Sequence, residues 1–289
     1  MQLTKDQQQQ AYLNIKHKFD YKNLDYIKQF IILNSPEVRN SFRDDVWIVV
    51  AGHLTFIDEL IVFYKGMKNV LVVVDSKEDI TKIKKLEINN IKYTVSQTPS
   101  NCGFGNVNLQ TVSSLEGMEY LKRQGVKYAI RIRSDQLIVQ MHDFINAHNF
   151  DKIGSICICL NTPQHNPQDN FFGLIKKFCI DNNIPKNVKR DFTTNYILDY
   201  CLTGPVEHLH EMFQYKEEEH FYAPAEHKLL LTYLYRTNKH LTNSIDFLRE
   251  NFVFFYNTLK ENNIDFLSLK QNYHNWTVAI GIQPWLYTV

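Results

Sequence analysis

Residues 46–51 read VWIVVA, an uninterrupted apolar run that follows Asp45 and is closed by Gly52. A short run that is apolar at every position is typical of a strand buried on both faces of a parallel sheet. A second run, NVLVVVD, occupies residues 69–75 and ends in a carboxylate. The two runs predict two buried strands of an α/β sheet.

The segments that follow alternate between helical and strand patterns. The sequence predicts helices over residues 56–68, 79–86 and 107–123, and strands over residues 91–95 and 128–135. Strands that alternate with helices at this spacing indicate βαβ units. The predicted fold class is therefore α/β and Rossmann-like, with a mostly parallel central sheet and flanking helices.

The pattern is less regular after residue 140. A strand is predicted over residues 153–160, and the Pro- and Asn-containing residues 161–170 predict a loop. The tail from Asn251 has aromatic-rich strand character. The sequence also predicts further helices, over residues 171–182, 206–213 and 226–237.

Charge and hydropathy exclude several classes of protein. Lys and Arg total 32 and Asp and Glu total 31 in a chain of 289 residues, so no overall field attracts nucleic acid. Residues 1–10 are polar and lack the apolar centre of a secretory signal, and no run approaches the roughly 20 apolar residues of a membrane span. We therefore expect a cytoplasmic protein without a transmembrane segment, and peripheral membrane contact stays open.

Polar residues stand where the predicted strands end, the place at which open α/β sheets bind ligands. Gly52 and His53 follow the first strand, Asp75 ends the second, and Asp135 ends the fourth. The turn at Gly52 lacks the glycine-rich phosphate fingerprint of dinucleotide-binding proteins, and the sequence contains no Walker motif. These features disfavour a dehydrogenase or a P-loop enzyme.

Residues 128–135 read YAIRIRSD and carry the most specific pattern of the chain. A side-chain period of two puts Arg131 and Arg133 on one face of the strand together with Asp135. Two guanidinium groups beside one carboxylate suit a diphosphate held by the arginines, with a divalent cation on the acid. The alternative is a partly exposed strand with an ordinary Arg–Asp pair.

A family resemblance joins these features. Residues 106–114, NVNLQTVSS, followed by a helix and by the Arg-Ser-Asp of residues 133–135, resemble the WavE lipopolysaccharide-synthesis family. Residues 199–204, DYCLTG, and the Pro-Ala-Glu of residues 224–226 resemble two further elements of that family. The family itself is similar to GT-A glycosyltransferases, in which an acidic motif after the fourth strand binds a metal and the diphosphate of a nucleotide sugar.

The resemblance implies a GT-A glycosyltransferase that moves a sugar from a UDP- or GDP-sugar to a glycan acceptor in surface-polysaccharide synthesis. Residues 1–40 would then form an N-terminal helical arm, with apolar residues at helical spacing, on one GT-A domain at 41–289. Within that domain, residues 41–140 would bind the nucleotide sugar and residues 141–289 the acceptor. The implied donor-binding residues are Gly52, His53, Asp75, Asn106, Asn108, Gln110, Arg131, Arg133 and Asp135.

The catalytic prediction places a carboxylate beside the acceptor. An inverting transfer needs a base that takes the proton of the acceptor hydroxyl, and Glu226 is the candidate because a helix N-terminus would keep it ionised. Asp199 would hold acceptor hydroxyls, or supply the base in place of Glu226. Both residues have ordinary structural interpretations as well, Glu226 as a capping carboxylate and Asp199 as a turn residue near Gly204.

The metal prediction is left open by one departure from the GT-A pattern. GT-A enzymes commonly carry Asp-x-Asp, whereas residues 134–136 read SDQ and offer a single carboxylate. The resemblance implies Mn²⁺ or Mg²⁺ at Asp135, with His274 completing the site. Two other functions compete: a nucleotidyltransferase, although its glycine- and basic-rich loop is absent, and a degenerate GT-A-like domain that binds glycan or a partner.

Overall fold

The computed structural model describes residues 43–103, 106–156, 158–160, 195–197, 199–214, 225–237, 250–262, 264, 266–269 and 274–275. The predicted N-terminal arm, the predicted loop at 161–170 and the predicted helix at 171–182 lie outside these residues.

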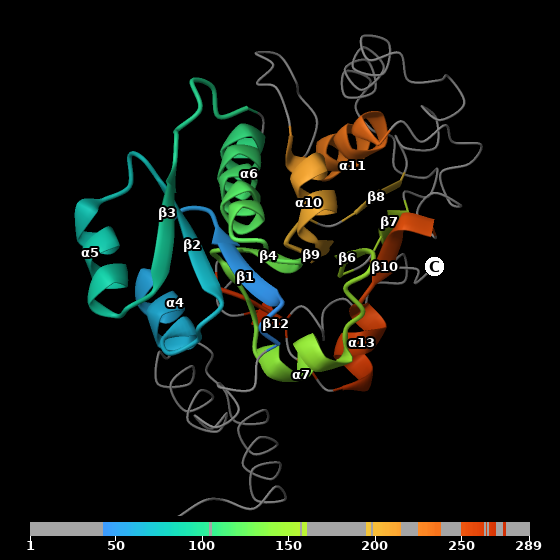
Figure 1. Ribbon diagram of the computed structural model, residues 1–289, viewed down its shortest axis with the longest axis horizontal. Coiled ribbons are helices and arrows are strands. Elements are labelled where there is room, and N and C mark those ends of the chain that lie inside the picture. The colour runs from blue at the N-terminus through green and yellow to red at the C-terminus, as the bar shows by residue number, and fades with distance from the viewer. Residues whose placement is uncertain are drawn as a thin grey trace, which may run out of the picture.

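Strands and helices alternate from β1 to β4 as the sequence predicts, and the order is less regular after β4 (Figure 1). The strands are β1 Val46–Ala51, β2 Val70–Asp75, β3 Lys92–Ser96, β4 Tyr128–Arg133, β5 Gln136–Ile138, β6 Ile153–Ser155, β7 Ile158–Leu160, β8 Asn195–Ile197, β9 Cys201–Pro205, β10 Phe252–Phe254, β11 Phe266–Ser268 and β12 His274–Asn275. The helices are α4 Ile57–Tyr64, α5 Ile80–Ile88, α6 Val107–Arg123, α7 Met141–Ala147, α10 Val206–Phe213, α11 Ala225–Arg236 and α13 Tyr256–Glu261.

The main sheet has seven strands in the order β10-β6-β9-β4-β1-β2-β3. β3, β2, β1 and β4 pair in parallel, β10 pairs in parallel with β6, and β9 runs antiparallel to both β4 and β6. The predicted fold class, α/β with a mostly parallel sheet, is confirmed. The sheet takes strands from both predicted halves of the domain, whose division at residue 140 stays a prediction.

Helices cover both faces of the main sheet (Figure 1). Ile48 and Val50 of β1 pack in one core cluster, with residues of α4, α7 and α13. Val49, which points the other way, packs in a second cluster with residues of α6, α10 and α11. Because every residue of β1 meets a covered face, an unbroken apolar run is the pattern that this position requires.

Most of the predicted boundaries agree with the structure, but two predicted strands are divided, and the tail predicted to have strand character also contains the helix α13. The strand predicted at 128–135 ends at Arg133, and after a turn the chain enters β5, which pairs with β11 in a separate three-stranded sheet. The strand predicted at 153–160 is also two strands, with β6 in the main sheet and β7 paired to β8. The apolar pattern marks strand character but not the sheet that a strand joins.

His148, which follows α7, gives the fold a testable pH dependence. Its ring stacks on Phe144 at 4.9 Å between centroids, and its Nε2 shares a hydrogen bond of 2.7 Å with Oγ1 of Thr203 in β9. Burial lowers the pKa of His148 to about 4, whereas the ordinary value is 6.5. Between these two values the unfolded chain binds more protons than the folded chain, so stability falls as the pH falls through this window.

We expect a shift from pH 7.5 to pH 5 to lower the free energy of unfolding by about 2 kcal/mol more in the wild type than in His148→Gln. Urea unfolding of both proteins at the two pH values measures the difference. Equal losses in the two proteins would show that His148 does not contribute to the acid sensitivity.

Candidate functional site

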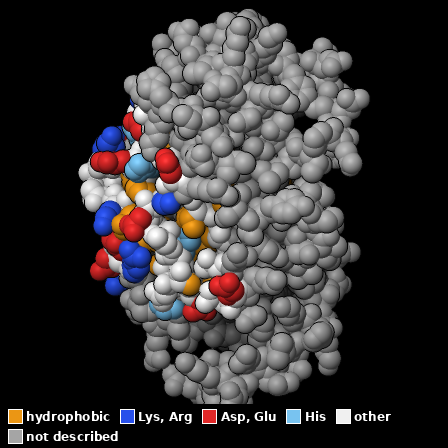
Figure 2. Space-filling view, turned by 90° about the vertical axis from the view of Figure 1, so that its right-hand side faces the viewer, with side chains coloured by type: hydrophobic (Ala, Val, Ile, Leu, Met, Phe, Trp, Pro, Cys, Tyr) orange, Lys and Arg blue, Asp and Glu red, His pale blue; other side chains and the backbone are white. Residues whose placement is uncertain are grey.

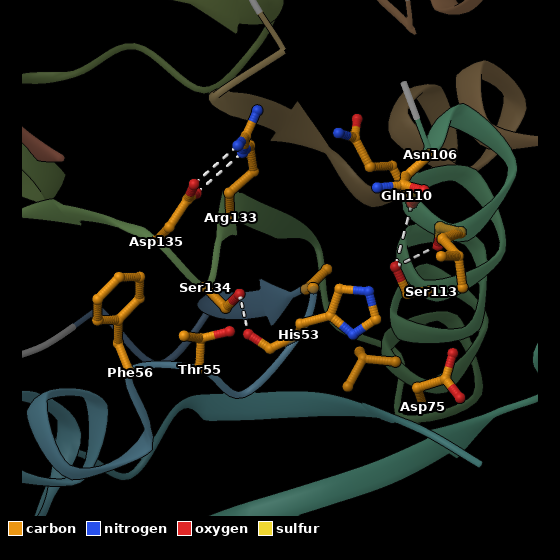
Figure 3. Close-up of a pocket in the computed structure, with 14 residues that line it drawn as sticks. His53, Thr55, Phe56, Asp75, Asn106, Gln110, Ser113, Arg133, Ser134 and Asp135 are labelled. Carbon is orange, nitrogen blue, oxygen red and sulfur yellow. Dashed lines mark hydrogen bonds and ion pairs between the residues drawn. The ribbon is translucent and has the colours of Figure 1, made fainter. Parts of the chain in front are cut away.

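A cavity of about 380 Å³ opens at the carboxyl ends of β1, β2 and β4, against the first two turns of α6 (Figure 3). Open α/β sheets bind ligands at this position. Main-chain turns, hydroxyl groups, amides and one ion pair make up its walls. The residues that line it are Ala51, Gly52, His53, Thr55, Phe56, Val73, Asp75, Asn106, Leu109, Gln110, Ser113, Arg133, Ser134 and Asp135.

The turn after β1 forms one wall and requires glycine at position 52. Gly52 has a φ of +133°, and a Cβ atom there would lie 2.7 Å from Oγ of Ser134. Ser134 is held on both sides: its backbone N–H donates to the carbonyl of Ala51 at 3.0 Å, and its Oγ donates to the carbonyl of His53 at 2.7 Å. The glycine therefore allows the ends of β1 and β4 to approach each other at the cavity.

One face of α6 forms the opposite wall. Asn106, Gln110 and Ser113 line the cavity at the spacing that places helical residues on one face. Asn106 directly precedes α6 and has a left-handed backbone with a φ of +62°. Oε1 of Gln110 is buried and accepts no hydrogen bond from the described residues. A ligand with an N–H or O–H group would satisfy this oxygen.

Asn108 differs from its neighbours because it does not line the cavity. Its Oδ1 accepts a hydrogen bond of 2.8 Å from Nζ of Lys228 in α11, and its Nδ2 donates to the carbonyl of Asn101 at 2.8 Å. Asn108 and Lys228 are both buried. The Asn108 side chain therefore fixes the start of α6 against α11 and the preceding loop.

Arg133 and Asp135 form the charged part of the cavity (Figure 3). Nε and Nη2 of Arg133 donate to the two carboxylate oxygens of Asp135 at 2.9 and 2.7 Å. Burial lowers the pKa of Arg133, but the hydrogen bond to Asp135 and the charge of Asp199 outweigh burial and raise it above its ordinary value. The guanidinium group is thus a permanent cation at the cavity, and this bidentate geometry is the one that also suits a phosphate.

Arg131 lies outside the cavity and is fully buried. Its Nε donates to Oγ of Ser114 at 2.9 Å, and its Nη1 donates to the backbone carbonyl of Asp199. Burial lowers the pKa of Arg131, and the nearby Asp199 acts in the opposite direction. The two arginines of the predicted pair therefore occupy different environments, with Arg133 at the cavity and Arg131 in the interior.

Asp199 is also buried, with 1% of its surface exposed, and it does not line the cavity. Both of its carboxylate oxygens are buried without a hydrogen-bond donor among the described residues. Asp75, by contrast, lines the cavity, and its Oδ1 accepts hydrogen bonds from the Lys77 N–H and the Thr98 hydroxyl. Asp75 is thus held at the end of β2 by the turn that follows this strand.

Two predicted residues are placed by their backbone alone. Glu226 is the second residue of α11, the helix that Lys228 joins to the start of α6. His274 pairs with Ser268 of β11, which pairs in turn with Gln136 of β5. The main-chain register therefore places His274 two strands away from the residue that follows Asp135.

Two described carboxylates line the cavity: Asp135, beside Arg133, and Asp75, whose Oδ1 already accepts hydrogen bonds from the Lys77 N–H and the Thr98 hydroxyl. No group of three His, Cys, Asp or Glu residues within the described part of the chain is arranged to hold a metal ion. Both oxygens of Asp135 are occupied by Arg133. A cation at Asp135 would compete with Arg133 for these oxygens, and the ligand would supply further oxygens, as phosphates do for Mg²⁺.

Several cavity residues were not predicted from the sequence. Thr55 and Phe56 lie beyond the first turn, and Ser113 lies on α6. Ser113 follows Gln110 by three residues, so the helical spacing alone could have identified it once Asn106 and Gln110 had been chosen. No comparable signal marks Thr55 or Phe56.

No family model matches the chain, and no curated protein matches it. Among solved structures, 54 chains match. One is a crystal structure of a proposed glucose-1-phosphate thymidylyltransferase from Bacillus anthracis in complex with sucrose. Its sequence is 8% identical, the alignment covers 66% of this chain and 82% of that chain, and the TM-score is 0.35.

The described helices include none with both the length and the apolar composition needed to cross a membrane. In Figure 2, Lys and Arg side chains are interspersed with Asp and Glu side chains over the described part of the face shown. This mixture agrees with the near balance of positive and negative residues in the sequence.

Proposed function

We propose that the chain is a GT-A-type glycosyltransferase that binds a UDP- or GDP-sugar in the cavity and transfers the sugar to a glycan acceptor in surface-polysaccharide synthesis. The observation that carries the proposal is the convergence of residues expected from the sequence on one cavity at the carboxyl ends of the strands. Those residues are Gly52, His53, Asp75, Asn106, Gln110, Arg133 and Asp135.

The two ends of the cavity suit the two parts of a nucleoside diphosphate. Arg133 supplies a guanidinium group that can donate two parallel hydrogen bonds to the diphosphate. Asp75 and the unpartnered Oε1 of Gln110 are acceptors for the hydroxyl and N–H groups of a nucleoside. When the diphosphate binds, Arg133 turns from Asp135 to the ligand, because the phosphate oxygens carry more charge than the carboxylate.

A divalent cation, when present, would be held by Asp135, with His274 as the second protein ligand, and would neutralise charge on the leaving diphosphate. Arg133 neutralises the same charge from the protein side. The acceptor hydroxyl loses its proton to Glu226 as it attacks the anomeric carbon, and the configuration at that carbon is inverted. Asp199 is buried outside the cavity, so of the two predicted bases we assign the role to Glu226.

A second function is favoured by one observation, the ion pair that occupies both oxygens of Asp135. A protein in which Arg133 never released Asp135 would be a GT-A-like domain that binds glycan or a partner without transferring sugar. A nucleotidyltransferase is the third possibility, and it would differ by forming pyrophosphate from a nucleoside triphosphate and a sugar phosphate.

Thermal unfolding in the presence of UDP, GDP and ADP, each with and without Mn²⁺, tests the proposal. We expect UDP or GDP to raise the melting temperature, since a ligand at a hundredfold excess over its Kd stabilises the folded state by about 2.7 kcal/mol. The same nucleotide should raise it much less in Arg133→Gln. If no nucleoside diphosphate shifts the melting temperature with or without Mn²⁺, the proposed function is wrong.

A further inference from the structure

Asp199 presents an unexplained energetic cost. It is 1% exposed, and neither carboxylate oxygen has a hydrogen-bond donor among the described residues. A buried carboxylate without donors destabilises a fold by several kcal/mol unless nearby charge compensates for it. The residue therefore requires a compensating cation, and the described part of the chain offers two.

The two cations are the guanidinium groups of Arg131 and Arg133. Nη1 of Arg131 donates to the backbone carbonyl of Asp199, which fixes the position of that residue. The next residue, Tyr200, accepts a hydrogen bond of 3.1 Å from the backbone N–H of Arg133 through its carbonyl. The Arg133 guanidinium carbon lies 5.1 Å from the centre of the Tyr200 ring. Asp199 is thus anchored beside both arginines.

Arg133 uses only part of its donor set on Asp135. Nε and Nη2 donate to the two oxygens of the Asp135 carboxylate at 2.9 and 2.7 Å. Asp199 acts on Arg133 through its charge and not through a hydrogen bond: this charge raises the pKa of Arg133, and the Asp199 oxygens have no donor among the described residues. A diphosphate bound by Arg133 would compete with Asp135 for the Nε and Nη2 donors.

We propose that Asp199 is a positioning residue, whose buried carboxylate keeps the guanidinium group of Arg133 at the base of the cavity when Arg133 exchanges Asp135 for the diphosphate of a nucleotide. Arg131, in β4, donates hydrogen bonds to both Ser114 of α6 and the carbonyl of Asp199, and so fixes the position of Asp199 relative to β4 and α6. This inference rests on the proposed function, because it assumes that a nucleoside diphosphate binds in the cavity.

Calorimetric titration with UDP and with uridine distinguishes a loss of Arg133 positioning from a general disruption of the cavity in Asp199 variants. Asp199→Asn keeps the side-chain volume and removes the charge, so we expect UDP affinity to fall roughly tenfold, the size of one charge-assisted interaction. Uridine affinity should not change, because uridine has no diphosphate. Asp199→Glu should restore most of the loss. Asp151→Asn is the control, since Asp151 accepts a hydrogen bond from Tyr128 at the opposite end of β4.

A double-mutant cycle identifies the residue through which Asp199 acts. In an Arg133→Gln background, Asp199→Asn should change UDP affinity by less than about twofold. The inference is overturned if the two effects simply add, if UDP and uridine weaken equally, or if UDP affinity is unchanged in folded Asp199→Asn. If UDP and GDP both fail to bind the wild type, the proposed function fails, and this inference fails with it.

Nuclear magnetic resonance of the wild type gives the answer if Asp199→Asn does not fold. UDP should shift both the side-chain Nε–Hε signal of Arg133 and the carboxyl carbon signal of Asp199, whereas uridine should shift neither. A shift of the Arg133 signal that leaves the Asp199 signal unmoved would contradict the inference.

Discussion

Glu226→Gln should lower kcat by about 10²- to 10⁴-fold and leave UDP affinity nearly unchanged. Glutamine has the shape of glutamate but cannot take the proton of the acceptor hydroxyl. The rate of the chemical step therefore falls, whereas nucleotide binding is unaffected. Glu226 lies in the first turn of α11, and Lys228 of the same turn donates a hydrogen bond to Asn108 near the start of α6. Initial rates and nucleotide titrations of the same preparation measure both quantities.

Glu211→Gln is the matched control for this experiment. Glu211 pairs with Arg236 at the other end of α11, so its replacement removes a carboxylate that contacts the same helix. We expect its kcat to stay close to that of the wild type. A small loss of kcat in Glu226→Gln would contradict the assignment of Glu226 as the base. A product that retains the anomeric configuration of the donor would contradict the inverting mechanism.

Asp135→Asn should reduce transfer by about 10³-fold, which corresponds to about 4 kcal/mol of transition-state stabilisation. The substitution removes the only carboxylate that the described cavity residues near Arg133 offer to a cation. In the absence of metal, however, UDP should bind Asp135→Asn at least as tightly as it binds the wild type. The reason is that Arg133 no longer has to leave a carboxylate, and one negative charge near the diphosphate is gone.

The opposite directions of these two effects make the Asp135 experiment informative. Asp58→Asn serves as control, since Asp58 forms an exposed ion pair with Lys85 on the surface of the molecule. If transfer persists in EDTA and Asp135→Asn is harmless, the arginine alone neutralises the leaving group. If UDP affinity falls in Asp135→Asn without metal, the exchange of Arg133 between carboxylate and diphosphate is wrong.

The parallel core of the sheet could be predicted from the sequence because its signal is local. Residues 46–51 are apolar at every position, and β1 is covered on both faces by helices. The 107–123 and 206–213 helices also agree with the structure residue for residue. The division of residues 128–138 into β4 and β5 depends on the pairing of β5 with β11, which lies more than 120 residues later in the chain. A local sequence pattern cannot identify such a distant pairing partner.

The candidate site could be predicted in part for the same reason. Gly52, Asp75 and Asp135 follow recognisable strands, and parallel strands bring such positions to one edge. Strand period also placed Arg131 and Arg133 on one face, but burial separated them, because α6 and α10 cover Arg131 while the cavity leaves Arg133 accessible. The position of each arginine along β4 decides which of them can contact a ligand, because the cavity lies at the carboxyl end of the strand. Side-chain periodicity carries no information about this position.

The crystal structure of the full chain with bound UDP, or with GDP if GDP binds more tightly, tests the central claim most directly. The account predicts the nucleotide in the cavity between Gly52 and α6, with the diphosphate within hydrogen-bond distance of the Arg133 guanidinium group and the Arg133–Asp135 ion pair broken. A nucleotide bound elsewhere on the molecule would contradict the account.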